Sequence, residues 1–183
     1  MAGHSVTLGA REPQKPALRE LAEEIGARTA SIQDAVAANE VVLFAIPWSE
    51  MEGTLSALGS LLDDRLVIDA ANNVRGDAMN SAAAVLAAAP RAGYVRAFNT
   101  LGWEMLERPV VDGVPADLFF CGPDGDPRAT VERLIADVGL RPVWVGGPEE
   151  VEVVDGVLRL WFTLVMKRGR GRRLAFKLIE DER

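Results

Sequence analysis

Short apolar runs recur along the chain, and between them apolar residues return at helical spacing. The runs are rich in Val, Ile, Leu and Phe, which is typical of strands in a parallel sheet covered on both faces. We expect strands at Ser5–Leu8, Arg28–Ser31, Val41–Ile46, Leu66–Asp69, Tyr94–Phe98, Leu118–Cys121 and Pro142–Val145. The segments between them predict helices at Gln14–Ile25, Ile32–Ala38, Met51–Leu61, Ala78–Ala88, Trp103–Leu106 and Pro127–Val138.

This alternation of strands and helices predicts an α/β fold with a Rossmann-like, doubly wound and mostly parallel sheet. Gly146-Gly147-Pro148 ends the last strand, and the pattern changes there. We therefore expect a nucleotide-binding sheet domain over residues 1–148. Residues 149–183 are expected to form a C-terminal helical segment that packs on it.

The C-terminal segment begins with a helix over Val151–Met166 that is apolar around most of its circumference. Such a helix packs on a sheet or on another copy of itself, so we expect a homodimer. A cluster of six cations follows, from Lys167 to Lys177. The cluster is either a solvated segment that neutralises the nearby acidic residues or an anchor for a polyanionic ligand. The acidic residues in question are Glu149, Glu150, Glu152, Glu180, Asp181 and Glu182.

Polar or turn-forming residues follow three consecutive predicted strands. They are Ile46-Pro47-Trp48, then Asn72-Asn73 after Asp69, and then Asn99-Thr100-Leu101-Gly102. Ligands of open α/β sheets bind beyond the carboxyl ends of the strands, so these turns are expected to line one crevice. Each of them alone also has a simpler interpretation, because Asn, Thr and Pro favour turns and caps whatever the function.

Gly9, Ala10 and Arg11 follow the first predicted strand. At the end of the second strand of a dinucleotide-binding unit, an acidic residue binds the ribose 2′-hydroxyl, whereas an arginine accommodates the 2′-phosphate of NADP. An apolar strand with G-x-G-x-x-G is expected about twenty residues earlier, but only Met1 and Ala2 precede Gly3. We therefore expect an N-terminally shortened unit that binds NADP weakly, because the glycine loop and the helix behind it hold the pyrophosphate.

Composition narrows the possible functions. The chain has 183 residues, 49% of them hydrophobic, enough to bury a substantial core. A net charge of −7 argues against a general nucleic-acid binder, which needs a basic face. Cys121 is the single cysteine, which excludes an intramolecular disulfide and a multi-cysteine metal site. His4 is the single histidine. Without a long apolar stretch or a signal-like N-terminus, we expect a cytoplasmic protein with no membrane span.

A succession of short motifs resembles the NADPH-dependent reductases of the deazaflavin coenzyme F-420, also called F-420-dependent NADP oxidoreductases. The resemblance runs over essentially the whole chain. The motifs are Ala2-Gly3-His4-x-Val6-Thr7-Leu8-Gly9-x-Arg11, Ala45-Ile46-Pro47-Trp48, Asp69-Ala70-x-Asn72, Ala97-Phe98-Asn99-Thr100, Cys121-Gly122-x-Asp124, Arg141-Pro142-x-x-x-Gly146, and Arg168-Gly169-x-Gly171 leading to Ala175-Phe176-Lys177-Leu178.

The resemblance implies roles for particular residues. The 2′-phosphate would lie against the strand end at Gly9, Ala10 and Arg11, with Lys15 one turn further on. The turns at Ile46-Pro47-Trp48 and at Asn72-Asn73 would flank the ribose and nicotinamide. Asn99, Thr100, Leu101 and Trp103, together with the C-terminal helices, would border the deazaflavin. The family tends to carry small residues where Gly102-Trp103 stands, so the indole would either stack on the deazaflavin or occupy its place.

The function expected from these features is hydride transfer between NADP(H) and coenzyme F-420. Such transfer needs two rings held face to face rather than acid–base groups, so we assign no catalytic residue and no metal. Two alternatives stay open. One is an NADP-dependent reductase of a small carbonyl or imine substrate, and the other is a non-catalytic interaction protein that keeps the fold after losing its phosphate loop.

Overall fold

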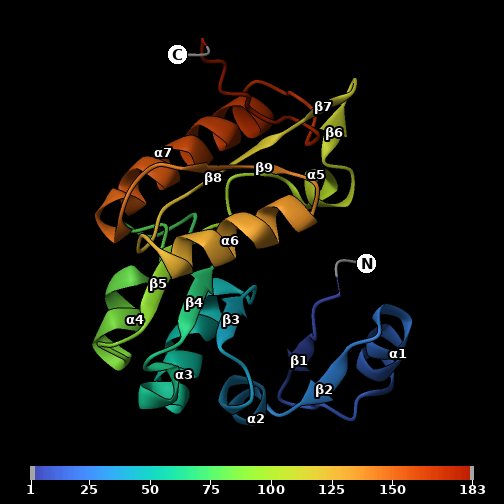
Figure 1. Cartoon of the computed structure of the whole chain (residues 1–183), viewed down its shortest axis with the longest axis vertical. Helices are drawn as coiled ribbons and strands as arrows, with labels where there is room; N and C mark the ends of the chain where they lie inside the picture. Colours follow the sequence, from blue (N-terminus) through green and yellow to red (C-terminus); the bar gives the residue numbers. More distant parts are fainter. Residues whose placement is uncertain (1–2, 182–183) are drawn as a thin grey trace.

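The computed structural model describes residues 3–181 and contains four separate strand ladders (Figure 1). β1 (Thr7–Gly9) pairs in parallel with β2 (Arg28–Ala30), and β3 (Val41–Phe44), β4 (Leu66–Asp69) and β5 (Gly93–Arg96) form a parallel ladder in that order. β8 (Asp117–Phe120) pairs in parallel with β9 (Arg141–Trp144), and an antiparallel bridge between Arg96 and Cys121 connects them to β5. The predicted Rossmann-like α/β class with mostly parallel pairing is therefore confirmed.

Helices connect the strands, as parallel pairing requires. They are α1 (Pro16–Ile25), α2 (Ile32–Ala37), α3 (Trp48–Leu58), α4 (Ala82–Ala88), α5 (Trp103–Glu107), α6 (Asp126–Asp137) and α7 (Val151–Phe162), with 3-10 turns at Gly59–Leu62 and Pro148–Glu150. Pro16 begins α1, and Gly26 ends it in the left-handed conformation at φ 67°. Proline at the first position and a left-handed glycine after the last are common helix boundaries, so these ends are encoded locally.

Two hydrophobic clusters form the core. One gathers α3, α4 and the buried side chains of β3–β5, including Phe44, Val67 and Tyr94. The other joins Ile68 and Val95 to β8 and to Val131 and Ile135 of α6. Val67 and Ile68 are neighbours in β4 but belong to different clusters, because successive side chains of a strand point to opposite faces of the sheet. The central strands are thus buried on both faces, as their continuous apolar runs predict.

Some sequence-based expectations need correction. The predicted helix Val151–Met166 is regular only to Phe162, and a π-helical turn covers Thr163–Lys167. Gly169 then has a left-handed φ of 68°, which an α-helix cannot contain, so residues 168–181 form an extended strap rather than a helix. The hairpin of β6 (Val110–Val111) and β7 (Val114–Pro115) was not predicted, although its turn, Asp112-Gly113, is a strong hairpin signal.

Candidate functional site

The carboxyl ends of β1 and β3 lie on the same side of the molecule. Arg11 follows β1, and Glu50 is in the first turn of α3, directly after β3. Nη1 of Arg11 lies 3.1 Å from Oε2 of Glu50. This ion pair joins two segments that are distant in sequence and brings the residues after β1 and β3 together.

The predicted phosphate residues occupy the end of β1 and the loop after it. Gly9 packs closely on α2, because a Cβ added there would lie 3.0 Å from the Cβ of Ala35. The backbone N–H of Ala10 donates to Ala30 O, which continues the ladder with β2 by one residue. The Arg11 side chain is 79% exposed, and Lys15 is an exposed residue at the N-cap of α1. Two cations therefore reach solvent beside the strand end.

The turn after β3 is partly built into the core. Ile46 and Trp48 are half-buried and pack against the first hydrophobic cluster, whereas Pro47 is exposed and caps α3. Proline is well suited to this position, since it lacks the N–H that a helix start leaves unpaired. Ile46 and Trp48 are therefore partly used for packing, and Pro47 is the exposed residue of this turn.

The two asparagines after β4 have different hydrogen-bond partners. Asn72 Oδ1 accepts from Nη2 of Arg96 at 2.7 Å, and its Nδ2 donates to Asn99 O at 3.4 Å. Asn73 Oδ1 accepts from Gly76 N–H at 2.9 Å, which closes a turn in its own loop. Asn72 therefore ties the loop after β4 to the loop after β5, and Asn73 shapes the loop that contains it.

The loop after β5 is mostly buried. Asn99, Thr100 and Leu101 are inaccessible or nearly so, and Thr100 Oγ1 has no hydrogen-bond partner within residues 3–181. Trp103 differs, with 62% of its surface exposed at the start of α5. Phe98, before this loop, has a left-handed φ of 61°, which is rare for a bulky residue and marks a constrained turn. Among the four predicted substrate residues, Trp103 is the one that is mostly exposed to solvent.

A buried arginine organises these loops, and sequence analysis missed it. Arg96 at the end of β5 is fully buried and donates from Nη1 to the carbonyl oxygens of Asp69 and Ala71. Its Nε lies 2.9 Å from Oδ1 of Asp155 in α7, and the pair is inaccessible to solvent. When the carboxamide oxygen of Asn99 faces the guanidinium, it accepts from Nε and Nη2 at 3.2 Å. Arg96 therefore holds the loops after β4 and β5 against α7.

A second buried acid completes the network. Asp69 Oδ2 accepts from the hydroxyls of Ser81 and Tyr94 at 2.6 and 2.9 Å, and Oδ1 accepts from Ala71 N–H. Burial and the neighbouring Asp69 carboxylate raise the pKa of Tyr94. The tyrosine therefore stays protonated and acts as a donor. The available signals were an Arg inside an apolar strand and an Asp inside an apolar helix, since such residues are rarely buried without partners.

The cation cluster from Lys167 to Lys177 is partly paired. Nε of Arg172 lies 2.5 Å from Oε1 of Glu104 in α5, and Nζ of Lys177 lies 2.9 Å from Oδ1 of the buried Asp117. One interpretation of the cluster was that it neutralises the acidic residues nearest in sequence. Those residues are not the partners of these two cations. The reason is that the strap folds back over α5 and β8.

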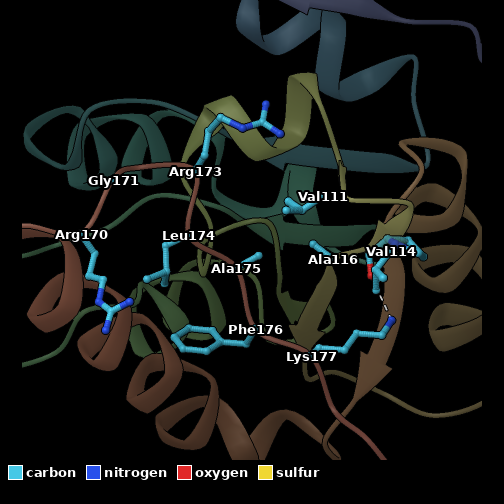
Figure 2. A pocket seen from close by; sticks show the side chains of 11 residues that line it. Val111, Val114, Ala116, Arg170, Gly171, Arg173, Leu174, Ala175, Phe176 and Lys177 are labelled. Carbon is cyan, nitrogen blue, oxygen red and sulfur yellow. Dashed lines mark hydrogen bonds between the residues drawn. The ribbon is translucent and has the colours of Figure 1, made fainter.

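A cavity of about 390 Å³ lies beside this strap. Figure 2 shows Arg170 and Arg173 among the residues that line it. Its apolar lining includes Val111, Val114 and Phe176. No accepting side chain for Arg170 is present among residues 3–181, and Arg173 has one long contact, 3.5 Å to Val110 O. Two guanidinium groups therefore remain available to an anion at this surface.

Neither a metal centre nor a membrane span emerges from the described part of the chain. Within residues 3–181 no group of three or more His, Cys, Asp or Glu side chains is placed to hold a metal ion. No helix there is long and apolar enough to cross a bilayer.

Cys121 is buried, and burial is the main cause that raises the pKa of its thiol to about 12. This thiol is therefore a poor nucleophile at neutral pH.

Comparison with known proteins identifies similar folds. A candidate F420-dependent NADP-reductase from Arthrobacter sp. FB24 matches with a TM-score of 0.80 and 22% identity, over 97% of this chain and 90% of that one. A hypothetical protein from Sinorhizobium meliloti matches with a TM-score of 0.65 and 24% identity, over 80% and 75%. A reductive aminase from Aspergillus terreus, solved with NADPH and ethyl levulinate, matches with a TM-score of 0.65 and 22% identity, over 90% of this chain and 55% of that one.

No curated protein sequence matches the chain. The solved structures share its fold, and their identities are below 25%. The family model described as "NADP oxidoreductase coenzyme F420-dependent" matches residues 1–73, the part that contains β1 to β4 and both predicted cations, Arg11 and Lys15. The resemblance of this chain to the F420-dependent NADP oxidoreductase family is therefore confirmed over its N-terminal 73 residues.

Proposed function

We propose that this chain is an NADP(H)-dependent oxidoreductase whose hydride partner is the deazaflavin coenzyme F-420. The observation that carries the proposal is the exposed Arg11 guanidinium at the carboxyl end of β1, inside the segment that matches the family model. The family's name supplies the coenzyme, and the reductase folds among the solved structures support the reaction class.

The residues at the end of β1 fit the 2′-phosphate of NADP. An arginine fork pairs with phosphate oxygens in two parallel hydrogen bonds, and Lys15 adds a second positive charge. Glu50 is the present partner of Arg11, so a bound phosphate has to replace one carboxylate. The exchange is feasible because both side chains are largely exposed, and exposed ion pairs are weak. We assign no residue to the pyrophosphate.

The turns after β3, β4 and β5 are proposed to hold the reacting rings. Ile46, Pro47 and Trp48 would form one wall, Asn72 and Asn73 the next, and the Asn99–Trp103 loop the side facing the deazaflavin. When bound, the two coenzymes supply the hydride chemistry themselves. The chain's part is to fix the loops, which Arg96 does through its bonds to Asn72 and Asn99, and to exclude water.

Anaerobic mixing tests the proposal directly. The protein is combined with reduced F-420 and NADP, and NADPH formation is followed by its absorbance. NADPH formation in proportion to the enzyme present supports F-420 as partner. If no hydride transfer occurs although NADP binds, the deazaflavin assignment is wrong.

One observation favours a second candidate, a reductase of a small carbonyl or imine. The reductive aminase from A. terreus shares the fold of this chain, and this chain spans about 55% of its length. NADPH oxidation with a panel of ketones and amines, in the absence of F-420, distinguishes this candidate. Binding of NADP without activity toward either substrate class would favour a non-catalytic interaction protein.

A further inference from the structure

The cavity in Figure 2 lies between the β6–β7 hairpin and the C-terminal strap, and its volume is about 390 Å³. Cavities that bind small organic ligands typically measure about 300–1,000 Å³. None of the residues that we assign to the nucleotide or to the deazaflavin lines this cavity. It therefore shares no lining residue with the proposed nucleotide site.

Hydrogen bonds hold the walls of the cavity in place. Phe176 O accepts from Asp117 N–H at 3.2 Å, which fastens the strap to β8. Leu174 O accepts from the indole N–H of Trp161 at 2.9 Å, which fastens it to α7. Nζ of Lys177 donates to a backbone carbonyl oxygen of β7 at 3.0 Å. The cavity is thus formed by contacts within the chain, and a preformed site lowers the entropy cost of binding.

Most of the lining is apolar. Val111 and Val114 of the hairpin line the cavity and are 40% and 48% exposed. The strap adds Leu174, Ala175 and Phe176 to the same lining. Removing apolar surface from water is favourable, so these side chains favour a ligand with an apolar body.

The charged groups at the cavity are positive. Arg170, Arg173 and Lys177 line it, and no Asp or Glu does so within residues 3–181. The amine of Lys177 is already paired with Asp117 at 2.9 Å, whereas the two guanidinium groups keep free donors. The whole chain has a net charge of −7, so this local excess of cations favours an anion at this surface.

These two features together define the ligand. An arginine fork pairs with a carboxylate in two parallel hydrogen bonds, and the apolar lining suits a hydrocarbon chain. A simple inorganic anion would leave the apolar lining unused. A neutral hydrocarbon would leave the guanidinium groups without a partner.

We propose that this cavity binds a small organic carboxylate with an apolar body, of the size of a medium-chain fatty acid. Its carboxylate pairs with Arg170 or Arg173, and its hydrocarbon chain lies against the hairpin and the strap. The inference rests on the lining of the cavity and its charge, and it does not depend on the proposed hydride transfer. Long-range attraction of a coenzyme tail by the same cations requires no occupancy of the cavity.

The test uses octanoate as the probe, titrated into the whole chain labelled for NMR. We expect saturable binding with a dissociation constant of about 1 mM or lower, and the largest amide shifts at Val111, Val114 and Phe176. Acetate has the charge without the apolar body, and octylammonium has the body with the opposite charge. Each should bind at least tenfold more weakly. Absence of saturable octanoate binding, or equal binding of octylammonium, would overturn the proposal.

Matched variants test the arginines. Arg170→Gln combined with Arg173→Gln should weaken octanoate binding at least fivefold, because the carboxylate loses its charge-assisted partners. Lys167→Gln combined with Arg168→Gln removes the same charge from exposed residues that do not line the cavity, so the affinity should stay unchanged. Urea denaturation checks that both variants are folded. An equal loss of affinity in the two double variants would refute direct pairing.

Two other occupants would give different results. Displacement of octanoate by F-420 in a competition titration would identify a coenzyme tail as the occupant. Loss of octanoate binding as the protein concentration is raised would assign the cavity to a second copy of the chain. Either result would contradict a separate carboxylate site.

Discussion

At the scale of single residues, we expect Arg11 to decide which nucleotide the proposed enzyme binds. Arg11→Ala removes a charge-assisted pair with the 2′-phosphate, so the NADP dissociation constant should rise about ten- to a hundredfold. NAD has a hydroxyl at that position, and its dissociation constant should change by less than twofold. Calorimetric titration of both nucleotides measures the difference. Glu50→Gln, which frees Arg11 from its partner, should strengthen NADP binding, and equal losses for both nucleotides in Arg11→Ala would contradict the assignment.

Arg96 and Asp155 contribute to the stability of the fold as a pair. Arg96 lies between two buried carboxylates, Asp155 at 2.9 Å and Asp69 at 3.4 Å. Asp155→Ala removes the nearer one and leaves Asp69, so the free energy of unfolding should fall by up to about 3–5 kcal/mol, measured by urea denaturation. Arg96→Met combined with Asp155→Leu should recover only part of that loss, because Asp69 then lacks the guanidinium. A loss in the double variant as large as in Asp155→Ala would contradict this account.

At the scale of elements, the strap is fastened to β8 through Asp117. Burial acts to raise the pKa of Asp117, but hydrogen bonds from Arg141, Leu178 N–H and Lys177 outweigh it and hold the pKa below 3.8. A lowered carboxyl pKa contributes stability above the unfolded value and loses it as pH falls through the folded value. We expect protection of the Leu178 amide to be constant from pH 7 to 5 and to fall below pH 4. Asp117→Asn should abolish this dependence, and a titration centred near pH 6 would contradict it.

The same strap carries the cations that we expect to attract an anionic coenzyme tail. Attraction by exposed charges is screened beyond about 8 Å at physiological ionic strength. The KM for F-420 should therefore rise as salt is increased from low to high ionic strength. Arg170→Gln with Arg173→Gln should reduce that slope and leave the KM for NADPH unchanged. If the KM for F-420 stays flat with salt, these guanidinium groups are only a solvated surface.

α7 has an apolar stripe that its own chain leaves uncovered. Val154, Leu158 and Trp161 are buried, whereas Val153 and Leu160 on the adjoining face are exposed. A two-fold dimer would cover that stripe. Light scattering at micromolar concentration should give twice the chain mass of 19.7 kDa, and Leu160→Glu should shift it to the monomer. A monomeric mass for the unaltered chain would contradict this prediction.

At the scale of the whole molecule, local pattern was sufficient to predict most of the helices and strands. The strands Val41–Phe44 and Leu66–Asp69 and the helix that begins at Ile32 lie where the apolar runs place them, because strand and helix periods are properties of adjacent residues. Gly26 and Pro16 mark helix ends for equally local reasons. The mostly parallel pairing of the strands also follows, since strands joined by helices have few arrangements.

The sequence alone thus determined the class of the fold, the succession of its elements and the turns expected to form the crevice. Tertiary structure decided which polar side chains bond to one another and hold the loops in place. Asn72 and Asn99 bond to Arg96, and Arg96 is paired with Asp155, which comes 59 residues later. It also decided that the C-terminal cations pair with Glu104 and Asp117, and that β1 and β3 face each other across an open groove. These features depend on contacts between segments that are distant in sequence, and the spacing of apolar residues within one segment does not predict such contacts.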